Sequence, residues 1–200
     1  MPTKDISVIA ARRIATEAHE GQTDRGGTPY INHAVAVADM ALDIAWSELT
    51  PLVASDRIFV VIEALGLLHD VIEDASTNAQ RVDRMRRITI QCGKDIADGV
   101  TALTRDPLES YVDYIRQVAG APYAVRVVKR ADNRHNSDLT RVAKPVVRCA
   151  RCKTHHDDVG SRCRCAPVNT ETALVNTPAD RVRADKYAVT ELLLERCGTV

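Results

Sequence analysis

Aromatic residues are scarce in this chain of 200 residues, which has one Phe, one Trp and five Tyr, or 4% in total. A core built mainly from Ala, Val, Leu and Ile is typical of helices that pack through aliphatic side chains. Hydrophobic residues make up 45% and charged residues 27%, as in an ordinary soluble protein. The length predicts one domain, or one domain with an insertion, and it suffices to bury a substantial core.

Net charge and long apolar runs are also absent. The 27 basic residues balance 27 acidic ones, which argues against a general nucleic-acid-binding protein but leaves a local basic patch open. No apolar run approaches the roughly 20 residues of a membrane-spanning helix, and residues 1–13 lack the apolar core of a signal peptide. We therefore expect a cytoplasmic protein without a membrane segment, whose six Cys residues are free or metal-bound rather than disulfide-linked.

Regularly spaced apolar residues predict an all-α fold, a multi-helix bundle. One helix begins at Ser55 and carries Ile72 on its buried face, and another begins at Pro122. The other expected helices cover residues 4–20, 30–49, 79–92, 94–103, 109–118 and 179–197. Helix 79–92 carries four arginines that we expect to face solvent: Arg81, Arg84, Arg86 and Arg87.

Four ionisable residues stand at the end of one apolar run, Leu65–Asp74. His69 continues the buried face of the predicted helix, and Glu73 lies one turn beyond it. Asp70 and Asp74 form a second pair at the same i, i+4 spacing. Because an apolar helix rarely ends in this many ionisable groups unless something binds them, the segment is interpreted as half of a metal site with its catalytic acids attached.

Two further polar residues interrupt apolar stripes elsewhere. His33 lies within the stripe of helix 30–49, where a lone His is usually a core residue hydrogen-bonded to a neighbour. Asp132 interrupts the stripe of the helix that begins at Pro122, and a buried carboxylate needs either a basic partner or a cation. Where the helices pack, both residues can converge with the His69–Asp70 pair. Two imidazoles and two carboxylates suit Mn²⁺, Fe²⁺ or Zn²⁺.

The order of these residues, H…HD…D, resembles that of the HD phosphohydrolase superfamily. Five ordered motifs within residues 4–143 resemble, more narrowly, the hydrolase domain of RelA/SpoT proteins and the stand-alone small alarmone hydrolases. The motifs are Gly21–Arg25, Gly27–His33, Leu68–Asp74, Gly99–Thr104 and Lys129–Asn136. Five motifs in the same order make the resemblance to the superfamily specific, and it implies an all-helical HD-domain bundle.

The resemblance also implies an activity: metal-dependent removal of the 3′-diphosphate from guanosine 3′,5′-bis(diphosphate), which releases diphosphate and GDP or GTP. A single divalent ion, usually Mn²⁺, and a small-molecule nucleotide are the implied cofactor and partner. Matched by position, the metal ligands are His33, His69, Asp70 and Asp132. Glu73 and Asp74 match the acidic pair that orients and activates the attacking water. Arg25 and Asn136 match residues that contact the nucleotide.

The chain departs from the usual sequence of these motifs at several positions. Ala34 follows His33 where most relatives have Pro, which affects only the start of a helix. Asn133 and the segment Ser137–Leu139 also differ, and this end of the last motif helps to shape the nucleotide pocket. Hydrolysis of another nucleotide, such as a deoxynucleotide, is therefore the alternative. A non-enzymatic binding protein is a third hypothesis, but it requires an incomplete site, whereas all four ligands and both acidic residues are present.

Four Cys residues cluster late in the chain: Cys149, Cys152, Cys163 and Cys165. A Cys-x-x-Cys pair is a usual half of a structural zinc site, and Cys-x-Cys can supply a tighter second half. The surrounding residues lack a helical period, so the alternative is a loop with incidental cysteines. We expect an HD hydrolase domain at 1–143, an irregular Cys-rich insertion at 144–178 that is a possible zinc knuckle, and a C-terminal helical segment at 179–200 that packs on the HD domain. The oligomeric state stays open.

Overall fold

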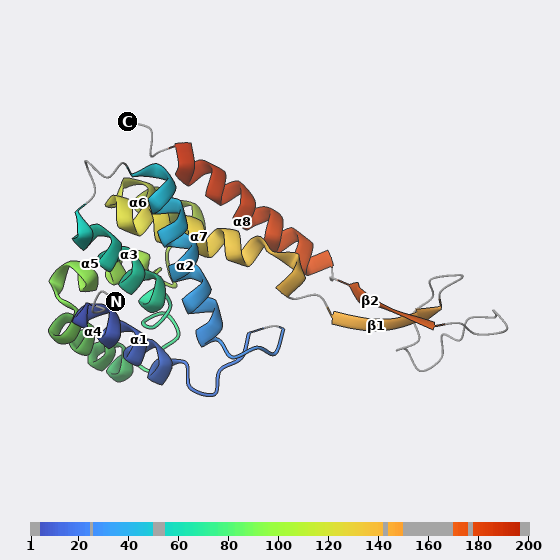
Figure 1. Cartoon of the computed structure of the whole chain (residues 1–200), viewed down its shortest axis with the longest axis horizontal. Helices are drawn as coiled ribbons and strands as arrows, with labels where there is room; N and C mark the ends of the chain where they lie inside the picture. Colours follow the sequence, from blue (N-terminus) through green and yellow to red (C-terminus); the bar gives the residue numbers. More distant parts are fainter. Residues whose placement is uncertain are drawn as a thin grey trace.

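The computed structural model describes residues 5–24, 26–49, 55–141, 144–149, 170–175 and 178–196. Within these ranges the chain forms a helical bundle, and a pair of strands projects from one end of it (Figure 1). The predicted all-α bundle is confirmed. The two strands are not predicted by the sequence pattern, which indicates only an irregular insertion at this point.

The described residues form eight α-helices, and apart from α3 their bounds match the predicted ones with small shifts at the ends. They are α1 (Ile6–Ala18), α2 (Ile31–Glu48), α3 (Asp56–Leu68), α4 (Asn78–Cys92), α5 (Lys94–Leu103), α6 (Tyr111–Gly120), α7 (Tyr123–Ser137) and α8 (Pro178–Arg196). A short 3₁₀ helix follows α7 at Leu139–Arg141, and the strands are β1 (Lys144–Cys149) and β2 (Thr170–Val175).

Local sequence explains where several helices begin and end. The side chains of Asp5, Thr77 and Ser110 cap α1, α4 and α6 by accepting hydrogen bonds from backbone N–H groups two or three residues further on. Gly93 separates α4 from α5 as predicted, and its φ of 102° lies in a region that favours glycine.

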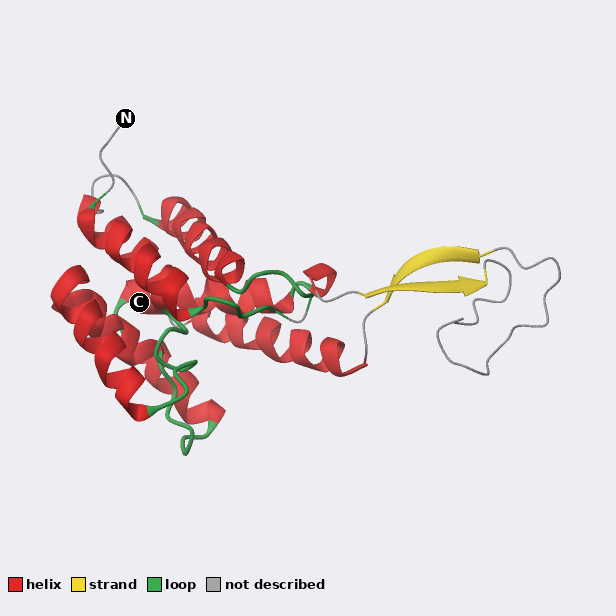
Figure 2. Ribbon diagram, turned by 90° about the horizontal axis from the view of Figure 1, so that it is seen from below, coloured by secondary structure: helices red, strands yellow, loops and turns green. Residues whose placement is uncertain are grey.

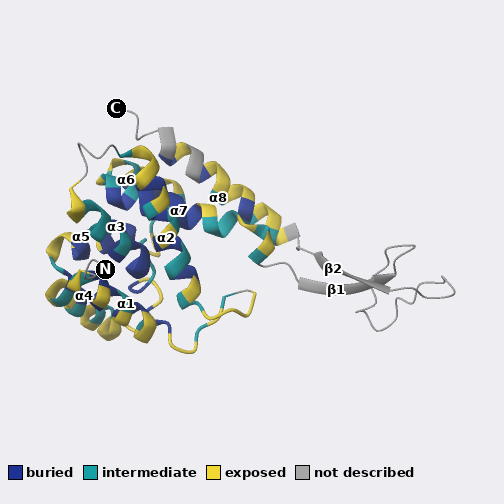
Figure 3. Cartoon of the chain, viewed as in Figure 1, coloured by how far each residue is buried: buried dark blue, intermediate teal, exposed yellow. Residues whose placement is uncertain are grey.

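The core lies around α3 and α7, whose residues are the most continuously buried in the bundle (Figure 3). Ile62 and Leu65 of α3 and Val127 of α7 are almost completely buried. Gly66 of α3 packs directly on Ala38 of α2, since a Cβ built on this glycine would lie only 2.4 Å from the Ala38 Cα atom. The glycine therefore allows a close approach of α2 and α3 that a larger residue would prevent.

Helix α3 ends earlier than predicted, at Leu68, and residues 69–74 form successive turns. The backbone N–H of Val71 donates to the carbonyl of Leu68 at 3.1 Å, and that of Asp74 donates to the carbonyl of Asp70 at 2.9 Å. The prediction that the helix itself continues through Ile72 is wrong. One helix-like turn nevertheless keeps Asp70 and Asp74 at the expected spacing.

Arg84 of α4 contacts the turn that follows α3. Its guanidinium donates to the carbonyl of Val71 at 2.7 Å and to that of Ala18, at the end of α1, at 3.3 Å. Backbone carbonyls that a helix would use are thereby bonded to a side chain. The prediction that Arg84 only faces solvent is wrong, because the turn after α3 and the end of α1 both provide it with acceptors.

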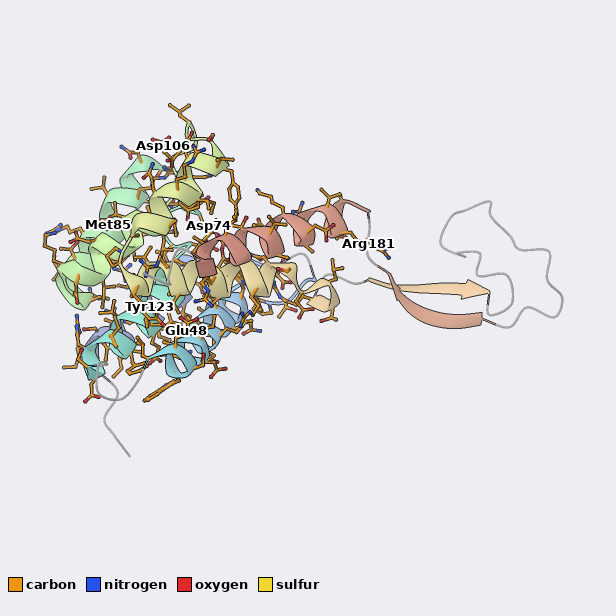
Figure 4. All side chains as sticks on the ribbon, turned by 90° about the horizontal axis from the view of Figure 1, so that it is seen from above. Glu48, Asp74, Met85, Asp106, Tyr123 and Arg181 are labelled. Carbon is orange, nitrogen blue, oxygen red and sulfur yellow. The ribbon has the colours of Figure 1, made fainter. Side chains whose placement is uncertain are left out.

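A second polar contact joins α2 to α7. The carboxylate of Glu48 accepts a hydrogen bond from Arg130 at 2.7 Å and another from the hydroxyl of Tyr123 at 3.0 Å (Figure 4). Both donors lie on α7 and Glu48 is the last residue of α2. These contacts therefore hold the end of α2 against α7.

The strands close an excursion of the chain between α7 and α8. They pair antiparallel, with Lys144 opposite Val175 and Cys149 opposite Thr170. Helix α8 then returns and packs along α7 (Figures 1 and 2). Among the helices that the structure describes, none is both long and apolar enough to cross a membrane.

Candidate functional site

Three helices bring together the four residues predicted as metal ligands. His33 lies in the first turn of α2, the His69–Asp70 pair directly follows α3, and Asp132 lies in α7. Potential ligand atoms of His33, His69 and Asp70 all lie within 4.8 Å of one another. The Oδ1 atom of Asp132 lies 3.4 Å from Nε2 of His33 and 3.6 Å from Nε2 of His69. Side chains far apart in the sequence therefore converge as expected.

The hydrogen bonds of His69 show how its ring can serve a metal. Its Nδ1 lies 2.9 Å from the carbonyl oxygen of Gly66, which can only accept, so Nδ1 carries a hydrogen. In the neutral ring, the lone pair then lies on Nε2. That atom faces Nε2 of His33 at 3.2 Å and a carboxylate oxygen of Asp70 at 2.9 Å. This donor set fits a divalent cation.

The electrostatics of the cluster agree with that fit. Burial lowers the pKa of His69, but the carboxylates of Asp70 and Asp132 raise it well above its usual value. Two buried carboxylates thus favour a positive species beside them, either a proton or a metal ion. Because the four side chains are nearly buried, with only Asp70 partly exposed, water screens this preference weakly.

Further side chains hold the two carboxylates. The hydroxyl of Tyr30 donates to Asp70, and the ammonium group of Lys129 lies 2.8 Å from Oδ2 of Asp132. Although burial acts in the opposite direction, Lys129 holds the pKa of Asp132 well below its usual range. Asn136, predicted to contact the nucleotide, donates to Oδ1 of Asp132 at 2.6 Å. Sequence reasoning missed Tyr30 and Lys129 in these roles, although Lys129 precedes Asp132 by one helical turn.

Glu73 and Asp74, the predicted water-activating pair, lie in the turn after α3 and line the same cavity as the cluster. The carboxylate of Glu73 accepts from the backbone N–H of Arg105 at 3.4 Å, and that of Asp74 lies 3.7 Å from Nδ1 of His19. Partial burial and the nearby charge of Asp70 raise the pKa of both carboxyl groups. A raised pKa makes a carboxylate a better proton acceptor.

The cavity beside the cluster has a volume of about 510 Å³. Lysines and arginines on its walls are Arg105, Lys129, Arg141, Arg183 and Lys186, and tyrosines are Tyr30, Tyr111, Tyr114 and Tyr187. The ammonium group of Lys186 lies 3.6 Å from the ring centre of Tyr111, so α8 contacts α6 across this wall. Cations and aromatic rings together suit a phosphorylated molecule with a planar base.

Helix α8 supplies three of these lining residues, Arg183, Lys186 and Tyr187. The sequence pattern predicts this helix with a packing role only, so the contribution of these residues to the cavity was not expected. Their i, i+3 and i+4 spacing on one side of the helix is the signal that could have found them.

The remaining predicted site residues are only partly covered. Arg25 lies outside the described residues, although its neighbour Asp24 lines the cavity and pairs with Arg141 at 3.2 Å. Cys152, Cys163 and Cys165 lie outside the described residues as well. Cys149 is the last residue of β1.

Comparison with known proteins finds relatives of this chain among the (p)ppGpp synthases/hydrolases. No family model matches the chain. The bifunctional (p)ppGpp synthase/hydrolase SpoT of Escherichia coli (strain K12) is 33% identical over 133 residues, which cover 62% of this chain and 16% of SpoT. The bifunctional (p)ppGpp synthase/hydrolase RelA of Mycobacterium tuberculosis is 30% identical over 163 residues, or 72% of this chain and 18% of RelA. The chain thus spans less than a fifth of these curated relatives.

A solved structure shares the fold. It is described as a metazoan ortholog of SpoT that hydrolyzes ppGpp and plays a role in starvation responses. The match covers 98% of this chain and 96% of the other, with a TM-score of 0.59 and 18% identity. The two proteins thus share a helical fold, within which His and Asp side chains of this chain converge. The likeness of this chain to the RelA/SpoT hydrolases, predicted from its five motifs, is confirmed by its sequence relatives.

Proposed function

We propose that the protein is a metal-dependent phosphohydrolase that removes the 3′-diphosphate from guanosine 3′,5′-bis(diphosphate). Water adds to the 3′-phosphorus, the bond to the 3′-oxygen breaks, and GDP and diphosphate leave; the pentaphosphate would yield GTP. The observation that carries the proposal is the convergence of two imidazoles and two carboxylates beside two further acids, in a cavity that five Lys and Arg side chains also line. Phosphoryl transfer needs positioning and charge neutralisation rather than a nucleophilic side chain.

His33, His69, Asp70 and Asp132 would hold the divalent ion, for which we propose Mn²⁺. When bound, such an ion neutralises phosphoryl charge and lowers the pKa of nearby water. Nitrogen and carboxylate donors in equal number also suit Fe²⁺ or Zn²⁺, so the metal is to be identified by titration. Tyr30 and Lys129 support the site from outside by fixing the orientation of the two carboxylates.

Glu73 and Asp74 would orient the attacking water and accept its proton. Both lie in the turn that carries His69 and Asp70, and burial together with the charge of Asp70 raises their pKa, which makes each a better proton acceptor. Arg105, which lies beside Glu73, has a side chain that lines the cavity and would pair with phosphate oxygens.

The outer part of the cavity would hold the nucleotide. Arg183 and Lys186 of α8 supply positive charge for phosphate groups, and Tyr187 supplies a ring against which a base or sugar can pack. Arg25 and Asn136 stay predicted nucleotide contacts. For Asn136, the described contact is the hydrogen bond to Asp132, which leaves its other polar atom for a ligand.

The test is release of diphosphate from guanosine 3′,5′-bis(diphosphate) by the purified full chain with Mn²⁺, compared with an Asp70→Ala variant. Glu73→Gln and Asp74→Asn should each lower kcat by roughly 10²-fold or more, because each removes a proton acceptor. Their Mn²⁺ affinity should stay close to that of the unaltered chain, since neither residue is a proposed ligand. A rate no higher than that of folded Asp70→Ala would overturn the proposal.

The alternative substrate is another nucleotide, such as a deoxynucleotide. One feature favours this alternative. Leu139 lines the cavity, and it belongs to Ser137–Leu139, the segment where the last motif departs from its usual sequence. A panel of ribo- and deoxynucleotides under the same conditions separates the two. Faster hydrolysis of a deoxynucleotide than of guanosine 3′,5′-bis(diphosphate) would support the alternative.

A structural Zn²⁺ in the Cys-rich insertion is a separate proposal. It is supported by the antiparallel pairing of β1 with β2, which brings the two ends of segment 149–170 together. Thiolate ligands stay reduced in the cytoplasm, the location that the sequence predicts. Zinc content should fall when Cys149, Cys152, Cys163 and Cys165 are all replaced by Ser, while Mn²⁺ binding at the HD site persists. Equal zinc content in both proteins would contradict it.

A further inference from the structure

His135 makes an unusual contact with His33. It lies on α7 one turn after Asp132, is half-buried, and stacks its ring on that of His33 with 4.8 Å between centroids and 30° between planes. The Nδ1 atoms of the two rings are 2.6 Å apart. At this distance one nitrogen must carry the hydrogen and the other must accept it, since two hydrogens would clash and two lone pairs would repel.

The direction of this hydrogen bond decides what His33 can do. If His135 donated, neutral His33 would carry its hydrogen on Nε2, which faces Nε2 of His69 at 3.2 Å and Oδ1 of Asp132 at 3.4 Å. A protonated Nε2 cannot bind a cation. If His33 donates instead, its Nε2 lone pair points into the cluster.

The metal site of the proposed function requires the second arrangement, in which His33 donates from Nδ1 and a neutral His135 accepts through its own Nδ1. Arg141 holds the backbone at His135, since its guanidinium donates to the His135 carbonyl at 2.9 Å and to Asp24 at 3.2 Å. His69 shows the same design, because its Nδ1–H donates to the carbonyl of Gly66.

We propose that His135 is a positioning residue that accepts the Nδ1–H of His33 and thereby presents Nε2 of His33 to a divalent cation. The proposal rests on the metal site of the proposed function and adds a residue to it. The two imidazole ligands would then each be held by an outer acceptor, a side chain for His33 and a backbone carbonyl for His69. Outer partners of this kind fix both the tautomer and the ring orientation of a ligand.

Two substitutions separate hydrogen bonding from packing. His135→Phe keeps a ring to stack on His33 but removes the acceptor, whereas His135→Asn keeps an oxygen that can stand near the position of Nδ1. By calorimetric titration with Mn²⁺ alone, His135→Phe should raise the Kd about 10- to 100-fold. His135→Asn should recover a large part of the loss. A folded His135→Phe variant that binds Mn²⁺ as tightly as the unaltered chain would overturn the proposal.

A second measurement does not depend on any variant folding. Long-range ¹H–¹⁵N spectra of the unaltered chain, loaded with diamagnetic Zn²⁺, report which nitrogen of each imidazole carries hydrogen. His33 should be protonated at Nδ1, and His135 should have an unprotonated Nδ1. Protonation of His135 at Nδ1 would sink the assignment. Because neither measurement uses a nucleotide, a chain that binds metal this way but hydrolyses no guanosine 3′,5′-bis(diphosphate) would refute the proposed function and leave this inference standing.

Discussion

Replacement of Gly66 by Ala tests the close packing that brings His33 to the His69–Asp70 pair. The added Cβ would lie 2.4 Å from the Cα atom of Ala38 and 2.8 Å from its Cβ, whereas ordinary contact begins at 3.4 Å. The nearest atom belongs to the backbone of α2 and cannot rotate away. The two helices must therefore separate by about 1 Å to restore normal contact distances.

The expected loss of stability in Gly66→Ala is the difference between two opposing terms. Overpacking of a filled core costs about 1–3 kcal/mol, and replacement of a mid-helix Gly by Ala returns about 0.5–1 kcal/mol through backbone entropy. Because the clash at Gly66 involves backbone, we expect a net loss of about 1–2 kcal/mol. In a chain of this size that lowers Tm by roughly 2–8 °C. Mn²⁺ affinity should fall too, since His33 moves away from the other proposed ligands.

Thermal unfolding of the metal-free chain, followed by circular dichroism, measures the first effect, and titration with Mn²⁺ measures the second. Gly120→Ala is the matched control, because a Cβ at Gly120 meets no heavy atom within 4 Å. The control should be as stable as the unaltered chain or slightly more so. If Gly66→Ala matched the control in both Tm and Mn²⁺ affinity, the close approach of α2 and α3 would not be what positions the site.

Three further changes probe individual charges. Lys129→Met leaves the buried carboxylate of Asp132 without its ammonium partner, so the free energy of unfolding of the metal-free chain in urea should fall by about 3–5 kcal/mol; a loss below about 1 kcal/mol would contradict the pairing. Burial lowers the pKa of His19 below 6.5, so the unfolded chain binds a proton first and stability should drop as pH falls below about 6.5. The free energy of unfolding, measured with urea across this pH range, should drop less steeply for His19→Gln than for the unaltered chain. Identical slopes for the two proteins would contradict this role of His19. Arg57→Ala breaks an ion pair with Asp95 whose side chains are 45% and 50% exposed, so it should change the free energy of unfolding by less than about 1 kcal/mol, and a larger change would show that the pair is coupled to the core.

The sequence by itself determined the helical architecture and the identity of the converging side chains. Apolar spacing predicts the helices because each must bury one face against its neighbours. His33, the His69–Asp70 pair and Asp132 stand out because a polar residue within an apolar stripe needs a partner. The resemblance adds their expected roles, which stay predictions until the metal and the substrate are measured.

Tertiary structure alone decided the surroundings of these side chains. Helix α3 ends at Leu68, and in the turn that follows it the carbonyl of Val71 is bonded by Arg84 from another helix, while His69 bonds the carbonyl of Gly66. Arg183 and Tyr187 reach the cavity only because the chain returns after β2 and lays α8 along α7. A periodicity shows which face of a helix is apolar, but it does not show which distant helix that face or its polar edge will meet. Contacts between distant segments are set by packing of the whole chain, and the supporting residues of this site depend on such contacts.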